Sequence, residues 1–138
     1  MLLRDIMKRE VVSIFRDSPV IEAARKMEKH NIGCLVVIED GQAKGILTDR
    51  DIVLKVIARG SDPAFTKVEN VMEPHLISAG PDTDIPEALR LMSTHHVRRL
   101  PIREDGRIVG IVSAMDIARV VQEEVDNLFS LRATPVYH

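Results

Sequence analysis

Apolar and polar residues follow one order of patterns along the chain, and that order occurs twice. Short apolar or β-branched stretches at 11–14 (VVSI) and 76–79 (LISA) predict single strands. Apolar residues at helical spacing follow each stretch, at Val20, Ala23, Ala24 and Met27 and again at Ile85, Ala88, Leu89 and Met92. Ser18 and Thr83, just before these segments, are the expected helix N-caps.

Each helix is followed by the pattern of a β-hairpin. The apolar runs at 34–38 (CLVVI) and 99–102 (RLPI) both lead into Glu-Asp-Gly. Asp-Gly favours a tight hairpin turn, because both turn positions require positive φ. The returning strands are expected at 43–48 and 107–113.

A second helix closes each copy. It begins at Thr48 in the first copy and ends near Ala58, where glycine and proline stop it. In the second copy it begins at Ser113 and continues through RVVQEEVDNLF (119–129). Each copy therefore has the order β-α-β-β-α.

The two copies align without a gap when the sequence is shifted by 65 residues, which places 6–54 on 71–119. Identical residues include Met7 and Met72, both Glu-Asp-Gly turns, and the frame shared by GILTDRDI (45–52) and GIVSAMDI (110–117). Two long repeats indicate two supersecondary units that bury their sheets against each other. We expect an α+β fold of two pseudo-symmetric units, each a small sheet with helices on one face.

Composition and charge disfavour a nucleic-acid-binding protein and a membrane protein. A formal net charge of −2 offers no broad attraction for nucleic acid or anionic membranes, and aromatic residues make up only 3%. The single cysteine, Cys34, lies in an apolar run and is expected to be buried and inert. With neither a signal peptide nor a membrane span expected, the predicted localisation is cytoplasmic.

The duplicated β-α-β-β-α order, with Glu-Asp-Gly and G-I-x-[ST]-x-x-D-I in each copy, resembles a tandem pair of CBS domains, a Bateman module, in a stand-alone CBS-domain protein. The resemblance divides the chain into a first repeat (1–58), a linker (59–70), a second repeat (71–121) and a C-terminal helix end and tail (122–138). It implies a non-catalytic regulatory module that binds adenosine-containing ligands in clefts between the repeats.

The resemblance assigns ribose binding to Asp51 and Asp116, and ribose or phosphate binding to Thr48 and Ser113. A carboxylate can accept both hydroxyl protons of a cis-diol, and a helix N-terminus attracts phosphate. The same [ST]-x-x-D spacing is also a capping box that satisfies the amides of its own helix. Both roles stay open.

The first strand of each repeat is implied to line the adenine pocket of the other repeat's site. Val11 and Val12 would then face the nucleotide held by Asp116, and Leu76 and Ile77 the one held by Asp51. Ordinary core packing is the alternative for these four residues.

Arginines distinguish the two copies. Arg98 and Arg99 stand where the first copy has glycine and cysteine, and they resemble phosphate-contacting positions, since a guanidinium suits phosphate. The alternative is a surface pair bridged to Glu104 or Asp105. Arg50 could meet phosphate in the first copy, where the second has methionine, so the two sites are expected to be unequal.

No catalytic constellation or metal-ligand spacing is present, so neither enzyme activity nor a metal site is predicted, and His95-His96 lacks further ligands. The leading hypothesis is a sensor of adenine nucleotides, AMP first, then ADP or ATP. The alternatives are a scaffold or dimerisation module without ligand, a sensor of S-adenosylmethionine or NAD, and a nucleic-acid regulator, which the charge disfavours.

Partners follow from the same resemblance. A homodimer is expected, together with an unidentified regulated protein and no membrane. Beyond the second repeat, apolar residues continue and would cover the module itself or dock on a partner subunit, namely Leu128, Phe129, Leu131, Val136 and Tyr137.

Overall fold

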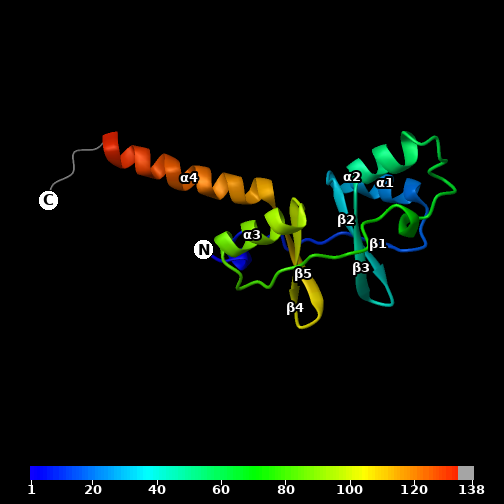
Figure 1. Ribbon diagram of the computed structural model, residues 1–138, viewed down its shortest axis with the longest axis horizontal. Helices are drawn as coiled ribbons and strands as arrows, with labels where there is room; N and C mark the ends of the chain where they lie inside the picture. The colour runs from blue at the N-terminus through cyan, green and yellow to red at the C-terminus, as the bar shows by residue number, and fades with distance from the viewer. Residues whose placement is uncertain (134–138) are drawn as a thin grey trace.

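The computed structural model describes residues 1–133, and its two similar halves lie side by side with their helices on the same side (Figure 1). The first half contains β1 (Ser13–Phe15), α1 (Val20–His30), β2 (Cys34–Glu39), β3 (Gln42–Thr48) and α2 (Asp49–Ile52), which continues as the π-helical η2 (Val53–Ile57). The second contains α3 (Ile85–His95), β4 (Arg99–Glu104), β5 (Arg107–Ser113) and α4 (Ala114–Ala133). The expected α+β fold of two repeated units is confirmed.

Both hairpins turn at the predicted Asp-Gly pairs. The φ angles are 52° at Asp40 and 75° at Gly41, and 51° at Asp105 and 77° at Gly106. Two successive residues with positive φ match the right-handed twist of the flanking strands. β2 with β3, and β4 with β5, pair antiparallel, and each ladder has a β-bulge at the equivalent place, Lys44 in β3 and Val109 in β5.

The first strand of the second repeat is not formed, although 76–79 was expected to be one. In the first repeat, β1 pairs in parallel with β2, and the amide of Val36 donates to the carbonyl of Val12 at 3.1 Å. Pro101 occupies the position equivalent to Val36 and has no N–H to donate. Only an isolated parallel bridge between Ala79 and Ile102 remains.

The helix caps expected at Ser18 and Thr83 are wrong. The first amides of α1, at Val20 and Ile21, donate to carbonyls of the linker, so no side chain caps this helix. α3 starts one residue later than expected, and the carboxylate of Asp84 accepts from the amide of Glu87 at 2.9 Å. Either arrangement satisfies amides that a helix start leaves free.

The two repeats exchange the segments that precede them. The short helix η1 (Leu3–Asp5) lies beside α3, and Leu3 is fully buried in the core of the second repeat. The equivalent η3 (Val68–Asn70) lies on the first repeat, where Val68 is fully buried. Each core is therefore completed by the segment that precedes the other repeat in the sequence.

The exchanged segments cross the sheets at equivalent places. Lys8 exchanges two backbone hydrogen bonds with Ile111 of β5, at 2.9 and 3.0 Å. Glu73 exchanges two with Ile46 of β3, at 3.0 and 2.8 Å. These crossings bring the segments before Val11 and before Leu76 against the opposite repeats.

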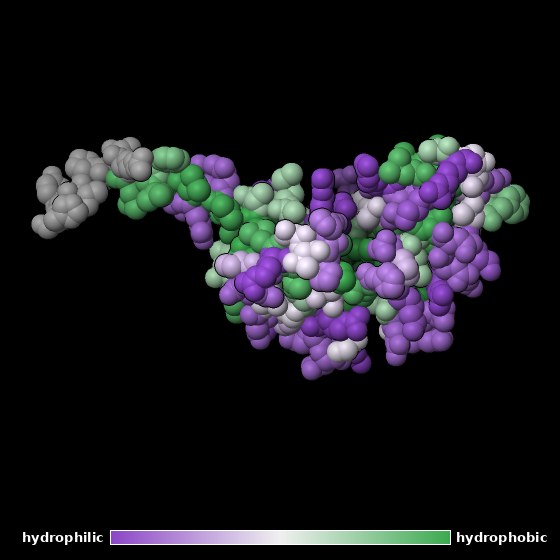
Figure 2. All heavy atoms as spheres, viewed as in Figure 1, coloured by the Kyte–Doolittle hydropathy of each residue, from purple (hydrophilic) through white to green (hydrophobic). Residues whose placement is uncertain are grey.

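α4 is the long helix that extends away from both sheets (Figure 1), and apolar side chains are exposed along it (Figure 2). They include Val121, Val125, Leu128, Phe129 and Leu131. Val136 and Tyr137, the last residues of the predicted apolar tail, lie outside the described residues. No helix in the described range 1–133 is long and apolar enough to cross a membrane.

Candidate functional site

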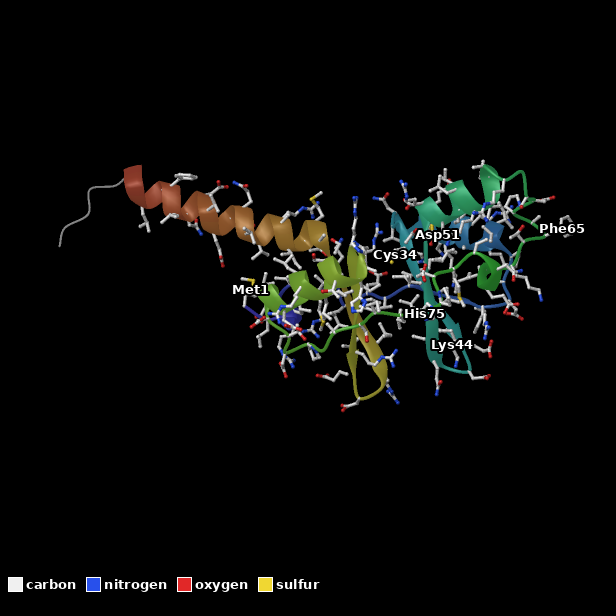
Figure 3. The ribbon with its side chains drawn as sticks, in the orientation of Figure 1. Met1, Cys34, Lys44, Asp51, Phe65 and His75 are labelled. Atoms are coloured by element: carbon white, nitrogen blue, oxygen red, sulfur yellow. The ribbon has the colours of Figure 1, made fainter. Side chains whose placement is uncertain are left out.

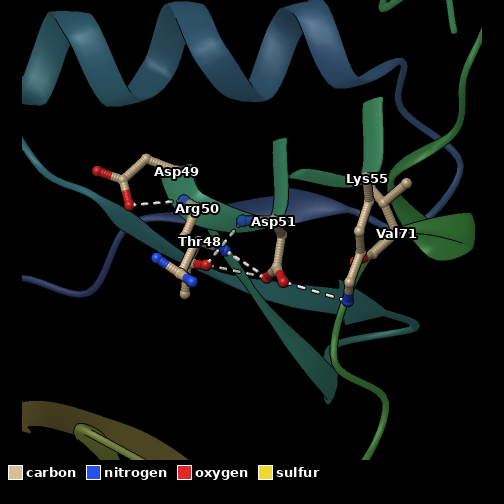
Figure 4. A network of polar contacts seen from close by, with 6 residues as sticks. All are labelled: Thr48, Asp49, Arg50, Asp51, Lys55 and Val71. Atoms are coloured by element: carbon tan, nitrogen blue, oxygen red, sulfur yellow. Dashed lines mark hydrogen bonds and ion pairs between the residues drawn. The ribbon is translucent and has the colours of Figure 1, made fainter. Parts of the chain in front are cut away.

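Thr48 and Asp51 form a reciprocal capping box at the start of α2 (Figure 4). The backbone amide and the hydroxyl of Thr48 both donate to Oδ2 of Asp51 at 3.0 Å, and the amide of Asp51 donates to the Thr48 hydroxyl at 3.2 Å. The capping interpretation of this motif is thus confirmed. It fixes the position of the Asp51 carboxylate, whose side chain is 18% exposed.

Lys55, which the sequence analysis did not single out, occupies the second oxygen of the same carboxylate. Its Nζ lies 3.1 Å from Oδ1 of Asp51 and donates to the carbonyl of Val71 at 3.1 Å (Figure 4). A lysine four residues after an aspartate on a helix is a signal that could have revealed this pair.

The second copy has the same box with fewer partners. The amide of Ser113 donates to Oδ2 of Asp116, and the amide of Asp116 donates to the Ser113 hydroxyl, both at 3.0 Å. The nearest cation to Oδ1 is Nζ of Lys8, at 3.9 Å, on the segment that crosses from the first repeat. Lys8 carries no sequence signal, because the crossing alone brings it here.

Arg50 and Met115, the unequal pair, both lie on the outside. Arg50 lines a shallow hollow of about 320 Å³ together with Asp49, Val53 and Leu54. Met115 is exposed at the start of α4. A larger hollow, about 470 Å³, lies near Phe15 and Asp40 at the hairpin end of the first sheet, away from both capping boxes.

Arg99 lies at the border between the repeats, close to Cys34. Burial raises the pKa of the Cys34 thiol, and Asp49 raises it further, while the positive charge of Arg99 opposes the shift. Cys34 is buried as expected and is paired in register with Thr48 (Figure 3 labels Cys34 and Asp51). Charges of both repeats thus act on one point of the border.

Arg98 and Arg99 make no ion pair within residues 1–131, whose side chains the structure describes, so bridges to Glu104 or Asp105 are not formed. Glu104 instead lies near Arg4. At the position equivalent to Arg98, the first repeat has Gly33, where an added Cβ would lie 2.8 Å from Oδ2 of Asp49. The Asp49 side chain thus covers the position at which the second repeat carries an arginine.

The expected adenine-pocket residues are all half-buried, at Val11, Val12, Leu76 and Ile77. Val12 packs against the first core and Ile77 against the second, so each takes part in core packing. The segments that carry them follow directly from the crossings at Lys8 and Glu73. In the described part of the chain, no group of three or more His, Cys, Asp or Glu residues could hold a metal ion.

Comparison with protein families identifies the fold. The model of the CBS domain matches residues 3–58 and again 68–123. The chain belongs to the CBS domain family. The first match ends just beyond η2 and the second ends within α4, and each includes η1 or η3, the segments that pack on the opposite core.

Relatives in the CBS family cover most of this chain. It is 40% identical over 116 residues to the CBS domain-containing protein YhcV of Bacillus subtilis, covering 84% of this chain and 82% of YhcV. It is 37% identical over 121 residues to hypoxic response protein 1 of Mycobacterium tuberculosis, covering 87% and 85%.

Solved CBS structures have the same fold. A putative signal-transduction protein with CBS domains from Burkholderia ambifaria superposes with a TM-score of 0.82 at 27% identity, covering 88% of this chain and 93% of that one. The CBS domain pair of MJ0100, in complex with 5′-methylthioadenosine and S-adenosyl-L-methionine, gives a TM-score of 0.81 at 28% identity, covering 90% and 98%. The chain is thus a CBS-pair regulatory module, and a related pair binds adenosyl ligands.

Proposed function

We propose that this CBS pair binds an adenosine-containing ligand between its repeats, with AMP preferred over ADP and ATP, and that binding regulates a partner protein. The ribose hydroxyls would donate to Asp51 or Asp116, whose carboxylates the capping boxes hold in place. Pre-organised acceptors lower the ordering cost of binding. The complex of the MJ0100 pair with two adenosyl ligands supports this ligand class.

The observation that carries the proposal is the meeting of Lys8 with Asp116, at 3.9 Å. Lys8 belongs to the segment that leads into Val11 and Val12, whereas Asp116 lies in the first turn of the last helix of the second repeat. A ligand at Asp116 would therefore touch both repeats. Such a ligand can bias their relative arrangement, which is how a binding event is transmitted.

Phosphate groups would find positive charge at the same border. Thr48 and Ser113 lie at helix starts, where amides and the helix dipole favour anions. Arg98 and Arg99 have no carboxylate partner in the part of the chain described above, so their guanidinium groups are available to a ligand, and Arg50 lies next to Asp51. A scaffold without ligand would not require this concentration of cations.

Self-association belongs to the same proposal. The exposed apolar residues of η2 and α4 would be covered in a homodimer. A relative with a CBS-CP12 arrangement from cyanobacteria is hexameric. We assign no catalytic role to any residue.

Isothermal titration of the purified chain with AMP, ADP, ATP, NAD, S-adenosylmethionine and 5′-methylthioadenosine tests the proposal. Saturable binding of AMP, stronger than that of ATP, is expected. Binding of S-adenosylmethionine or NAD but not of AMP would show that the preferred ligand is not AMP. No binding of any compound would favour the scaffold alternative. Light scattering that shows only a monomer would remove the homodimer.

A further inference from the structure

The two aspartates proposed to bind ribose differ in how completely their oxygens are already occupied. Asp51 accepts two hydrogen bonds from Thr48 on Oδ2 and the Lys55 ammonium at 3.1 Å on Oδ1. Asp116 accepts one backbone bond from Ser113 on Oδ2, and its Oδ1 has only Lys8 at 3.9 Å. Oδ1 of Asp116 therefore retains free lone pairs, whereas Oδ1 of Asp51 is engaged.

Lys55 is also held more firmly than Lys8. Its ammonium bridges Asp51 and the carbonyl of Val71 (Figure 4). Val71 is only 4% exposed, and 32% of the Lys55 side chain is accessible. The Lys8 side chain is 69% exposed and lies beyond hydrogen-bond distance of Asp116. Moving Lys8 aside breaks no close contact. Moving Lys55 breaks both its ion pair with Asp51 and its hydrogen bond to the carbonyl of Val71.

We propose that the native chain binds one adenosyl ligand, at Asp116, because Lys55 closes the site at Asp51. This inference rests on the proposed function. A ribose diol donates two hydrogen bonds to one carboxylate, so it needs lone pairs on both oxygens or on one that is free. At Asp51 it must displace an ammonium from a partly buried pair, which leaves the Val71 carbonyl without its partner.

The repeat supplies the test. Val120 stands 65 positions after Lys55 and, like it, four residues after its aspartate. The substitution Lys55→Val gives the first site the residue of the second, and Val120→Lys does the reverse. Lys29→Val removes the same charge from an exposed position on α1 and serves as the control.

Titration calorimetry measures the number of ligands bound, with AMP and the uncharged 5′-methylthioadenosine as probes. We expect one equivalent for the native chain and for Lys29→Val, and two for Lys55→Val. Asp116→Asn should abolish binding to the native chain. Val120→Lys should weaken binding about tenfold or more.

The outcomes separate this inference from the function on which it rests. Two equivalents in the native chain, binding retained by Asp116→Asn, or a single equivalent in Lys55→Val would overturn the closed first site while the adenosyl function stands. No binding by any variant would overturn the function itself. Because Val120 is half-buried, thermal unfolding of Val120→Lys is measured to check that it folds. If Val120→Lys does not fold, the number of ligands bound by Lys55→Val tests the inference.

Discussion

The carbonyl oxygen of Glu73 occupies the space into which a Cβ at Gly45 would project. The same carbonyl accepts the amide of Ile46 at 3.0 Å, so the backbones of the two repeats touch at this point. At Gly110, an added Cβ would lie 2.6 Å from Sδ of Met7 and 3.0 Å from the carbonyl of Lys8. The glycine of the duplicated motif is thus required by the crossing of the repeats.

Gly45→Ala should therefore be strongly destabilising, by about 2–4 kcal/mol, because the added methyl group meets backbone that is fixed by hydrogen bonds. Gly110→Ala should cost less, since the flexible Met7 side chain can move. Gly80→Ala is the control, as its nearest neighbour would lie 3.9 Å away. Urea denaturation measures all three, and equal stability of Gly45→Ala and Gly80→Ala would contradict the crossing.

Leu3→Ala should destabilise the second repeat, although it precedes the first. The substitution removes a fully buried side chain from the second core and should cost about 2–5 kcal/mol. Hydrogen exchange should report faster exchange at Leu100 and Val112 than at Leu35 and Leu47. Val68→Ala is the matched variant and should reverse this pattern; a change confined to the first repeat in Leu3→Ala would refute the exchange of segments.

Asp84→Ala should lower the free energy of unfolding by about 1 kcal/mol, because it removes the side chain that caps α3. Thr83→Ala should be close to neutral, since Thr83 contributes its backbone to the contact with Leu3. Thermal or urea unfolding of both variants compares the two. A larger loss in Thr83→Ala would restore the original cap assignment.

Cys34 should make stability depend on alkaline pH. Because burial raises the pKa of its thiol, the folded state binds the proton more tightly than the unfolded state does. The resulting stabilisation is present below the ordinary thiol pKa of about 8.5 and is lost as pH rises through the folded value. The difference in unfolding free energy between the native chain and Cys34→Ala should be constant at neutral pH and fall above about 8.5; a rise there would contradict it.

Arg98→Gln combined with Arg99→Gln should weaken AMP binding about tenfold and leave 5′-methylthioadenosine binding within about twofold, because only AMP carries phosphate. Arg107→Gln, on the exposed part of the second hairpin, is the control. Calorimetric titration gives both affinities. An equal loss for the two ligands would indicate that the arginines act on the fold instead.

The sequence was sufficient for the features that depend on neighbouring residues. Apolar spacing, Asp-Gly turns and the [ST]-x-x-D boxes are local, and the hairpins, the helices and the caps at Thr48 and Ser113 appear where they were predicted. The missing strand at 76–79 depends on Pro101, which lies more than twenty residues away and removes one donor from the ladder.

Contacts made by the segments that cross between the repeats could not be predicted from the sequence pattern. Nothing local indicates that linker carbonyls would satisfy the first amides of α1, or that Lys8 would reach Asp116. Lys55 could have been found from its spacing to Asp51 alone. The resemblance suggested only a phosphate-contacting role for Arg99, and its place near Cys34 and its effect on the pKa of that thiol required the structure.

The exchange of leading segments has a consequence for how the two sites can differ. Made between two separate copies of one repeat, the contacts of Lys8 with Ile111 and of Glu73 with Ile46 would form a domain-swapped dimer with two identical sites. Joining the copies in one chain keeps the swap and removes the demand for symmetry. Lysine at 55 and valine at 120 are free to differ for that reason.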